Sequence, residues 1–236
     1  MGGRRFKPGL VSSLVLGVLV LAFLGLGRWQ LERADYKRAR LAAFAHAAFI
    51  ERLDPAVTAP PFARVRLQGS FDPERHLLVD NQVLRGRAGV HVLTPFHPAV
   101  GGVTILVNRG WLPMPPDRSA LPAVPTPAGT LWIRGHLEAL RKPGVMLGAP
   151  DQPKPGQWPQ LLTYPDMNEI EKALGTTLYP QVLYLDADSP GGFQGRDWQP
   201  VTMGPERHTA YAVLWFALAL TGLAAWTVLS LRRPPP

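Results

Sequence analysis

Residues 10–26 read LVSSLVLGVLVLAFLGL and contain no charged side chain. A second uncharged stretch, AYAVLWFALALTGLAAWTVLSL, occupies residues 210–231. A helix of about 20 residues crosses the hydrocarbon layer of a bilayer, so each stretch is long enough to span it. The polar block between the two stretches is therefore expected to be a domain that is held at the membrane surface by both of its ends.

The positive charge of the chain is mostly a signal of membrane topology. The formal net charge is +8, but residues 28–207 hold 20 of the 25 basic residues and all 17 acidic ones, so this block is nearly neutral. The remaining basic residues lie in the two short ends, and short basic flanks stay on the cytoplasmic side of a membrane. We expect a bacterial plasma (inner) membrane protein with two spans, both termini cytoplasmic, an extracytoplasmic central domain and no nucleic-acid partner.

The first stretch is expected to remain as an anchor. A basic start also fits a cleaved signal peptide, but no small-x-small cleavage site follows the stretch. The chain continues instead into Gly27-Arg28-Trp29-Gln30, where Trp29 suits a membrane–water interface. The chain contains no cysteine, which excludes disulfides, thiolate metal binding and thioether attachment of a cofactor.

Changes in composition divide the chain into six segments. They are a cytoplasmic N-terminus at 1–9, a transmembrane helix at 10–27, an extramembrane helix at 28–53, an extracytoplasmic β-rich domain at 54–207, a second transmembrane helix at 208–231 and a cytoplasmic C-terminus at 232–236. The extramembrane helix is predicted from apolar residues at helical spacing. Asp54-Pro55 is expected to end it, because proline cannot continue the helical hydrogen-bond ladder.

An alternating pattern predicts that the middle block is a β-sheet. In residues 62–71 the odd positions are apolar or small and the even positions are polar, which is typical of a strand with one exposed face. Further strands are expected at 76–80, 89–95, 103–108, 131–137 and 178–186. Proline-rich connectors at 113–127 and 143–159 interrupt the sheet, and a short helix is expected at 166–174 with Asp166 at its start and Gly175 at its end.

These patterns predict a membrane-anchored α+β fold. Two transmembrane helices flank an extracytoplasmic antiparallel β-sheet that is curled or closed into a barrel-like domain. The sequence has no serine in a nucleophile elbow and no glycine-rich phosphate loop after a strand. We therefore expect a protein that is not an enzyme.

His208 is the strongest candidate for a metal ligand. It lies just before the second span, where the positive end of the helix dipole favours the uncharged imidazole that a metal requires. Tyr211 and Trp215 follow at i+3 and i+7, so the three side chains share one helix face. An imidazole next to aromatic rings can form a binding site for a flat, apolar macrocycle that carries iron. The alternative is an interfacial histidine among aromatic belt residues, with no cofactor.

Three residues that flank the two spans have two interpretations. Arg28 and Arg207 are placed to meet the acidic groups of such a macrocycle, or they are ordinary interfacial anchors that snorkel. Trp29 either closes the same site from the neighbouring helix or anchors the interface.

The string Asn108-Arg109-Gly110-Trp111 also has two interpretations. In the first, Trp111 fills the core and Arg109 pairs with an acid such as Asp80. In the second, Asn108, Arg109 and Trp111 form a docking surface for a partner protein.

Three segments together resemble the SURF1 (Shy1) family of assembly factors for haem-copper cytochrome c oxidase. They are GRWQLERADYK at 27–37, the strings VDN, GRAG, HVLTP and VNRGWLP between 79 and 113, and HTAYAVLWF at 208–216. Their order, their spacing and the two-span outline also match, so the resemblance covers nearly the whole chain. One departure is Val90, which stands where the family is expected to have an aromatic residue.

The resemblance implies a role in the maturation of this oxidase. It implies that His208 binds haem a as an axial iron ligand, that haem a is held transiently, and that the catalytic subunit of the oxidase receives it. Haem a synthase and the lipid bilayer are further implied partners. The alternatives are a cofactor-free membrane scaffold that docks on the oxidase through its outer β domain, and an unrelated outer-surface binding module.

Overall fold

The chain folds into two compact units. A computed structural model describes residues 5–50, 53–54, 56–100, 102–141, 146, 148–201 and 203–232. One unit comprises residues 1–42 and 200–236 and is helical, and the other comprises residues 43–199 and is built on a β-sheet. The expected terminal segments 1–9 and 232–236 lie partly outside the described residues, as do Pro55 and the start of the second proline-rich connector.

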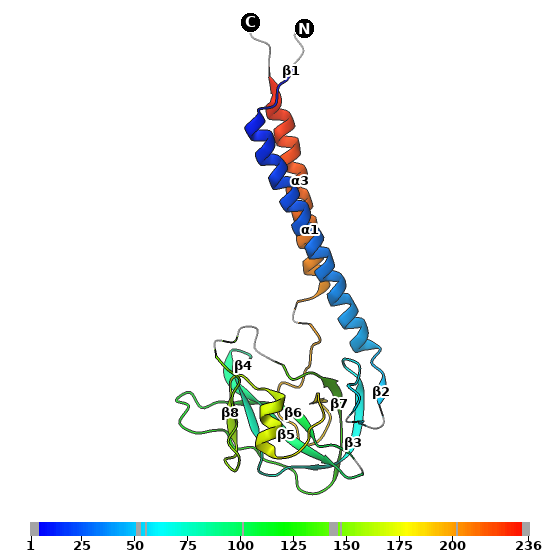
Figure 1. Ribbon diagram of the computed structural model, residues 1–236, viewed down its shortest axis with the longest axis vertical. Coiled ribbons are helices and arrows are strands. Elements are labelled where there is room, and N and C mark those ends of the chain that lie inside the picture. The colour runs from blue at the N-terminus through cyan, green and yellow to red at the C-terminus, as the bar shows by residue number, and fades with distance from the viewer. Residues whose placement is uncertain are drawn as a thin grey trace. The chain divides into compact units, whose positions relative to one another are not determined.

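The helical unit is an antiparallel pair. Helix α1 (Leu10–Ala45) and helix α3 (Pro205–Ser230) run side by side, and the start of α1 lies at the same end of the pair as the end of α3 (Figure 1). There, β1 (Arg5–Phe6) pairs antiparallel with β10 (Leu231–Arg232). Among the described residues, α1 and α3 are the two helices that are long and apolar enough to cross a membrane. The predicted spans are therefore present as helices.

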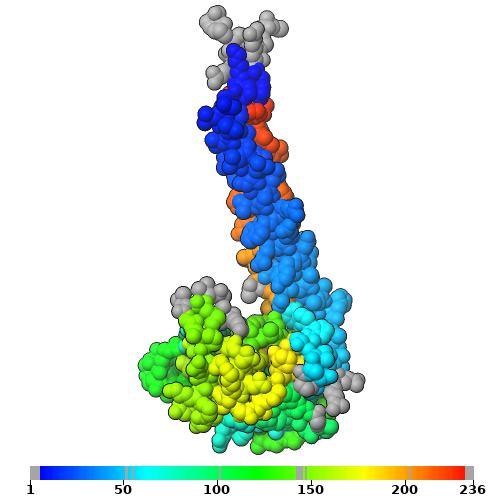
Figure 2. All heavy atoms as spheres, in the orientation of Figure 1, coloured from blue at the N-terminus to red at the C-terminus, as the bar shows by residue number. Residues whose placement is uncertain are grey.

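Small residues allow α1 and α3 to approach closely. The least exposed positions recur at alternating spacings of three and four residues, which is the pattern of side chains that interlock between two helices. Gly27 and Ala34 of α1 and Ala212 and Ala219 of α3 are buried in this way. A Cβ atom on Gly27 would lie 2.4 Å from the Phe216 ring, so this contact requires glycine. Figure 2 shows the spheres of α1 lying directly against those of α3.

The helix expected at 28–53 is a continuation of the first span, as expected of a helix that runs on out of the membrane, and it is shorter than expected. Helix α1 continues from the first span without a break and ends at Ala45, and β2 (Phe49–Ile50) follows it. The boundary between the units falls at residues 42–43, before the expected start of the β domain at residue 54. The end of the predicted helix was wrong because the strand pairing of β2 with β3, a tertiary contact, overrides local helix propensity.

All six predicted strands are present in the β unit, with shifted bounds, together with the short strands β2 and β8. The strands after β2 are β3 (Arg64–Phe71), β4 (Leu77–Leu84), β5 (Arg87–Pro98), β6 (Ile105–Pro113), β7 (Leu131–Glu138), β8 (Gln160–Leu162) and β9 (Val182–Leu185). Their order in the sheet is β2-β3-β7-β9-β6-β5-β4-β8, and an additional pairing of β3 with β5 closes the ring. The sheet is therefore a closed barrel of five strands with extensions at its edges.

The sheet is mixed rather than purely antiparallel. Strand β6 runs parallel to β9, β2 parallel to β3, and β4 parallel to β8, whereas the other pairs are antiparallel. A parallel pair requires a crossover connection, and the chain between β6 and β9 includes helix α2 (Met167–Leu174). The prediction of a barrel-like, mainly antiparallel sheet is confirmed, and the three parallel pairs were not predicted.

The core lies inside the barrel and beneath α2. The alternation of β3 is confirmed, since Val65, Leu67 and Phe71 are buried. On the other side, Ile170 and Leu174 of α2 pack into a second buried cluster. The predicted limits of α2 are also correct: the Asp166 side chain accepts a hydrogen bond from the Asn168 N–H, and Gly175 adopts the left-handed conformation with φ of 65°.

Candidate functional site

The first turn of α3 and the middle of α1 place His208 against Gln30. The distance between His208 Nδ1 and Gln30 Oε1 is 2.7 Å. Both residues occupy positions in the half-buried rows along which the helices pack, one helical turn from buried Gly27 and Ala212. The helix packing therefore fixes which way the imidazole ring faces.

This contact determines the chemistry of the imidazole. A carboxamide oxygen accepts hydrogen bonds and does not donate them, so Nδ1 carries the proton that joins the two side chains. In a neutral ring the lone pair then lies on Nε2. A histidine that donates from one ring nitrogen to a fixed acceptor and presents the other nitrogen is the arrangement that metal-binding histidines use.

Of the two aromatic candidates, the structure brings only Trp215 into the helix interface with His208. Trp215 is half-buried and stacks on Phe23 of α1, with ring centroids 5.6 Å apart and planes at 27°. Tyr211 lies at the flank of the pair and is 48% exposed. The two aromatic residues therefore do not form one face: Trp215 stacks between the helices, and the Tyr211 ring is exposed.

The cations predicted around His208 remain on the surface of the helical unit. Arg28 donates to Glu32 at 2.9 Å, and both side chains are exposed. Arg207 is exposed and makes no side-chain hydrogen bond or ion pair with the rest of the described chain. Trp29 is 52% exposed, so it does not close over His208, and Gln30 is the residue of this segment that does contact it.

Arg38 is a neighbour of His208 that the sequence analysis did not identify. Its Nη2 donates to Thr209 Oγ1 at 3.0 Å, and its Nη1 donates to Asp35 at 2.6 Å. Thr209 follows His208 directly, so this guanidinium lies next to the candidate ligand. The spacing of Gly27, Gln30 and Ala34 would have indicated the side of α1 that faces α3, but it does not identify the flanking residue that reaches across.

The three candidates for partner docking are buried in the β unit. The exposed fractions of Asn108, Arg109 and Trp111 are 2%, 0% and 2%, so their side chains offer no surface to a partner. Asn108 Oδ1 accepts from the Gly110 N–H, and Trp111 Nε1 donates to Gln82 O. Because they are buried, these residues do not form a docking surface as placed. They pack inside the β unit, which was the alternative interpretation.

Arg109 has no acidic partner among the residues described. Its guanidinium lies between the rings of Phe71 and Phe193, 4.8 Å and 4.6 Å from their centroids. It donates to three oxygen atoms at 2.6 to 2.9 Å: Gly191 O, Thr126 Oγ1 and Pro125 O. Burial lowers the pKa of this guanidinium to about 10.

The expected pair of Arg109 with Asp80 was wrong. Asp80 pairs with Arg118 of the proline-rich connector. Arg109 binds Pro125 and Thr126 of the same connector, so two arginine contacts hold residues 113–127 against the barrel as an ordered segment.

No cluster of three histidine or carboxylate side chains that could hold a metal ion occurs within the part of the chain that the structure describes. His208 is therefore a lone candidate ligand in a helix interface, and such a position suits a cofactor that brings its own metal coordination.

Two antiparallel membrane-spanning helices flank a closed β-barrel domain in the sequence. This arrangement defines a membrane-anchored α+β protein. The SURF1 family matches residues 17–220, a range that includes Gln30, Arg109 and His208, and the chain belongs to this family. It is 28% identical to a SURF1-like protein of Monosiga brevicollis over 98% of this chain and 94% of that protein. It is 28% identical to Surfeit locus protein 1 of Mus musculus over 89% and 73% of the two chains. For Surfeit locus protein 1 of Homo sapiens the identity is 27% over 94% and 78%.

Proposed function

We propose that this protein is an assembly factor for haem-copper cytochrome c oxidase that holds haem a transiently and passes it to the catalytic subunit. Membership in the SURF1 family supports the assembly role and argues against an unrelated outer-surface binding module. The contact between His208 and Gln30 is the observation that carries the haem part of the proposal. In this role the protein is a carrier and not an enzyme, and haem a synthase is a proposed donor.

The residues around His208 fit an iron macrocycle with acidic side groups. Nε2 of His208 would present its lone pair to the iron, and Gln30 would hold the ring by accepting a hydrogen bond from Nδ1. Haem a, when bound, supplies the iron and a broad apolar ring. Tyr211 and Trp215 supply aromatic surface on the same helix.

Cationic side chains at the same level of the helical unit suit the propionates of haem. Arg207 is exposed beside His208, and Arg38 reaches Thr209. Arg28 is held by Glu32 only in an exposed ion pair, which is worth about 0–1 kcal/mol and is readily exchanged for another carboxylate. These contacts lie at the surface, which suits a carrier because a partly exposed cofactor is easily released to the next protein.

Absorbance of the purified protein tests the haem proposal. The full chain, co-produced with haem a and purified in detergent, is expected to show a Soret band that His208→Ala abolishes. Gln30→Leu removes the acceptor for Nδ1 and is expected to weaken haem binding about 10-fold to 100-fold, as loss of such supporting contacts does at metal sites. His46→Ala removes an exposed histidine of the β unit and serves as the matched control.

Two results would decide against haem carriage. The first is the absence of a Soret band from wild-type protein, and the second is an unchanged band in His208→Ala. Either result would leave the cofactor-free scaffold, in which His208, Gln30 and Trp215 only pack the two helices. A deletion strain with normal oxidase activity would contradict the assembly role itself.

We also propose that the protein resides in a bacterial plasma membrane with both termini cytoplasmic and the β unit outside. The basic ends of the chain support this orientation. A reporter enzyme that is active only outside the cytoplasm should be active when fused after Pro127 and inactive when fused at Pro236. The reverse pattern would show that the orientation is inverted.

A further inference from the structure

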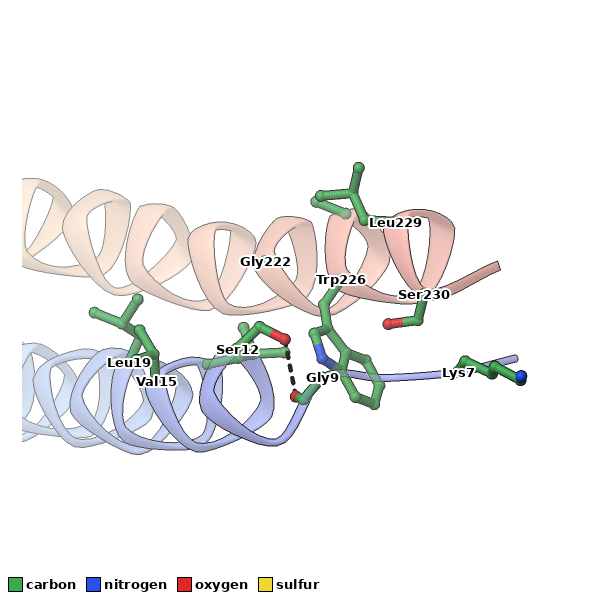
Figure 3. Close-up of a pocket in the computed structure, with 11 residues that line it drawn as sticks. Lys7, Gly9, Ser12, Val15, Leu19, Gly222, Trp226, Leu229 and Ser230 are labelled. Atoms are coloured by element: carbon green, nitrogen blue, oxygen red, sulfur yellow. Dashed lines mark hydrogen bonds between the residues drawn. The ribbon is translucent and has the colours of Figure 1, made fainter. Parts of the chain in front are cut away.

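A pocket lies between α1 and α3 at the end of the pair where both chain ends meet. Its volume is about 360 Å³, which is near the lower end of the range for ligand pockets. The start of α1 contributes Ser12, Val15 and Leu19, and the end of α3 contributes Trp226 and Leu229. Figure 3 shows Ser12, Leu19 and Trp226 on the facing sides of the two helices. This pocket is distinct from the surroundings of His208, which are formed by the first turn of α3 and the middle of α1.

Trp226 lines this pocket and carries a buried hydrogen-bond donor that is not used. Its Nε1 is the one buried side-chain nitrogen or oxygen in the described part of the chain that has no hydrogen-bond partner. The indole reaches from α3 toward Gly9 at the start of α1 (Figure 3). The Gly9 carbonyl oxygen already accepts from Ser12 Oγ at 2.9 Å and from Ser13 Oγ at 2.8 Å. A buried N–H without a partner costs about 1–3 kcal/mol, so a ligand that brings an acceptor oxygen gains this energy.

The same end of the helical unit is basic and contains no acidic residue. Lys7 lines the pocket, and its backbone N–H donates to Ser230 O at 2.8 Å. The antiparallel ribbon places Arg5 opposite Arg232 in the backbone register. In sequence, the first acidic residue after this end of α1 is Glu32, and none follows Glu206. The acceptor that fits this pocket is therefore an anion.

The rest of the pocket is apolar and opens on helices that are themselves apolar. Val15, Leu16, Leu19 and Leu229 form its walls, and Gly222 leaves room beside Leu16, whose Cδ1 would lie 3.2 Å from a Cβ at that position. Tryptophan and lysine near the end of a membrane span lie at the depth of lipid headgroups. The ligand that combines an anionic acceptor with an apolar body at this depth is a phospholipid.

We propose that this pocket binds an anionic phospholipid. A phosphate oxygen accepts the Trp226 Nε1–H once the indole turns this buried atom toward the pocket, Lys7 attracts the negative headgroup, and the upper part of the lipid lies against the leucines. Each basic residue near an anionic membrane surface contributes about 1 kcal/mol to such attraction. The bound lipid would fasten the ends of α1 and α3 together at the membrane surface.

Native mass spectrometry of the full chain in detergent tests the proposal with two titrated lipids, phosphatidylglycerol and phosphatidylcholine. Wild-type protein is expected to retain one phosphatidylglycerol with at least about 10-fold preference over phosphatidylcholine. Trp226→Phe keeps the ring and removes the donor, and it should weaken phosphatidylglycerol binding about 5-fold to 30-fold. Gly222→Leu fills the pocket and should abolish retention.

Matched variants and a phosphate competitor complete the test. Gly17→Leu adds the same side chain to α1 at a position with no neighbouring atom within 4 Å, and Trp132→Phe removes an indole donor in the β unit. Both should bind lipid like wild type. Equal retention of the two lipids, or unchanged binding in Trp226→Phe and Gly222→Leu, would overturn the proposal. Displacement of the lipid by millimolar inorganic phosphate would also overturn it, because the pocket would then recognise phosphate alone.

Discussion

Acid should destabilise the β unit through His136. This side chain of β7 is 1% exposed and stacks on Tyr184, with ring centroids 5.5 Å apart and planes at 16°. Phe44 and Phe62 pack against the same ring. Burial lowers the pKa of His136 from 6.5 to about 4, and the positive charges of Arg64 and Arg141 act in the same direction, whereas Glu138 opposes them.

The direction of the pH effect follows from this lowered pKa. Between pH 6.5 and 4 the unfolded chain binds a proton at His136 that the folded chain does not bind, so stability falls as the pH falls. One pKa unit corresponds to about 1.4 kcal/mol. The stability that depends on a neutral His136 is present above pH 6.5, and about 2–3 kcal/mol of it is lost by pH 4.5.

The variant His136→Phe isolates this contribution, because it keeps an aromatic ring in the stack and removes the titrating group. The measurement is the free energy of unfolding of the full chain in detergent, from urea titrations at pH 7.0 and 4.5 followed by near-ultraviolet circular dichroism. The loss of stability on acidification should be about 2–3 kcal/mol smaller in His136→Phe than in wild type. His46→Phe, which replaces an exposed histidine, provides the comparison. The same acid-induced loss in wild type and His136→Phe would refute the argument.

Two further substitutions test the packing of the two units. Gly27→Leu should destabilise the helix pair by about 1–3 kcal/mol because its Cβ would lie 2.4 Å from the Phe216 ring, whereas Gly17→Leu should have little effect on unfolding followed by far-ultraviolet circular dichroism. An equal effect of the two substitutions would contradict the close approach. Arg109→Lys should destabilise the β unit by about 2–4 kcal/mol in urea titrations, because an ammonium does not reproduce the planar fork of donors between two aromatic rings. The exposed Arg87→Lys is its control, and similar stability of both variants would show that the buried guanidinium is dispensable.

The site was predictable from the sequence only in part. His208 was identified by its place at the start of an apolar span, and that position is correct because the helix begins at Pro205. Its partner is Gln30 and not the neighbouring Trp29, and which of the two faces His208 depends on the rotation of α1 about its axis. Arg109 shows the opposite case: its buried position was compatible with the sequence, but its aromatic and carbonyl partners replaced the expected carboxylate.

The sequence by itself determined the two spanning helices, the six main strands and the capped helix α2, because charge-free length, alternation and capping residues act over neighbouring positions. The tertiary structure alone decided that β3 pairs with β5 to close the barrel, that β9 runs parallel to β6, and that His208 meets Gln30 across 178 positions of the chain. These contacts join segments that are distant in sequence. They are set by how whole elements pack and by which small residues let them approach. A local pattern of side chains does not identify the distant segment that an element will contact.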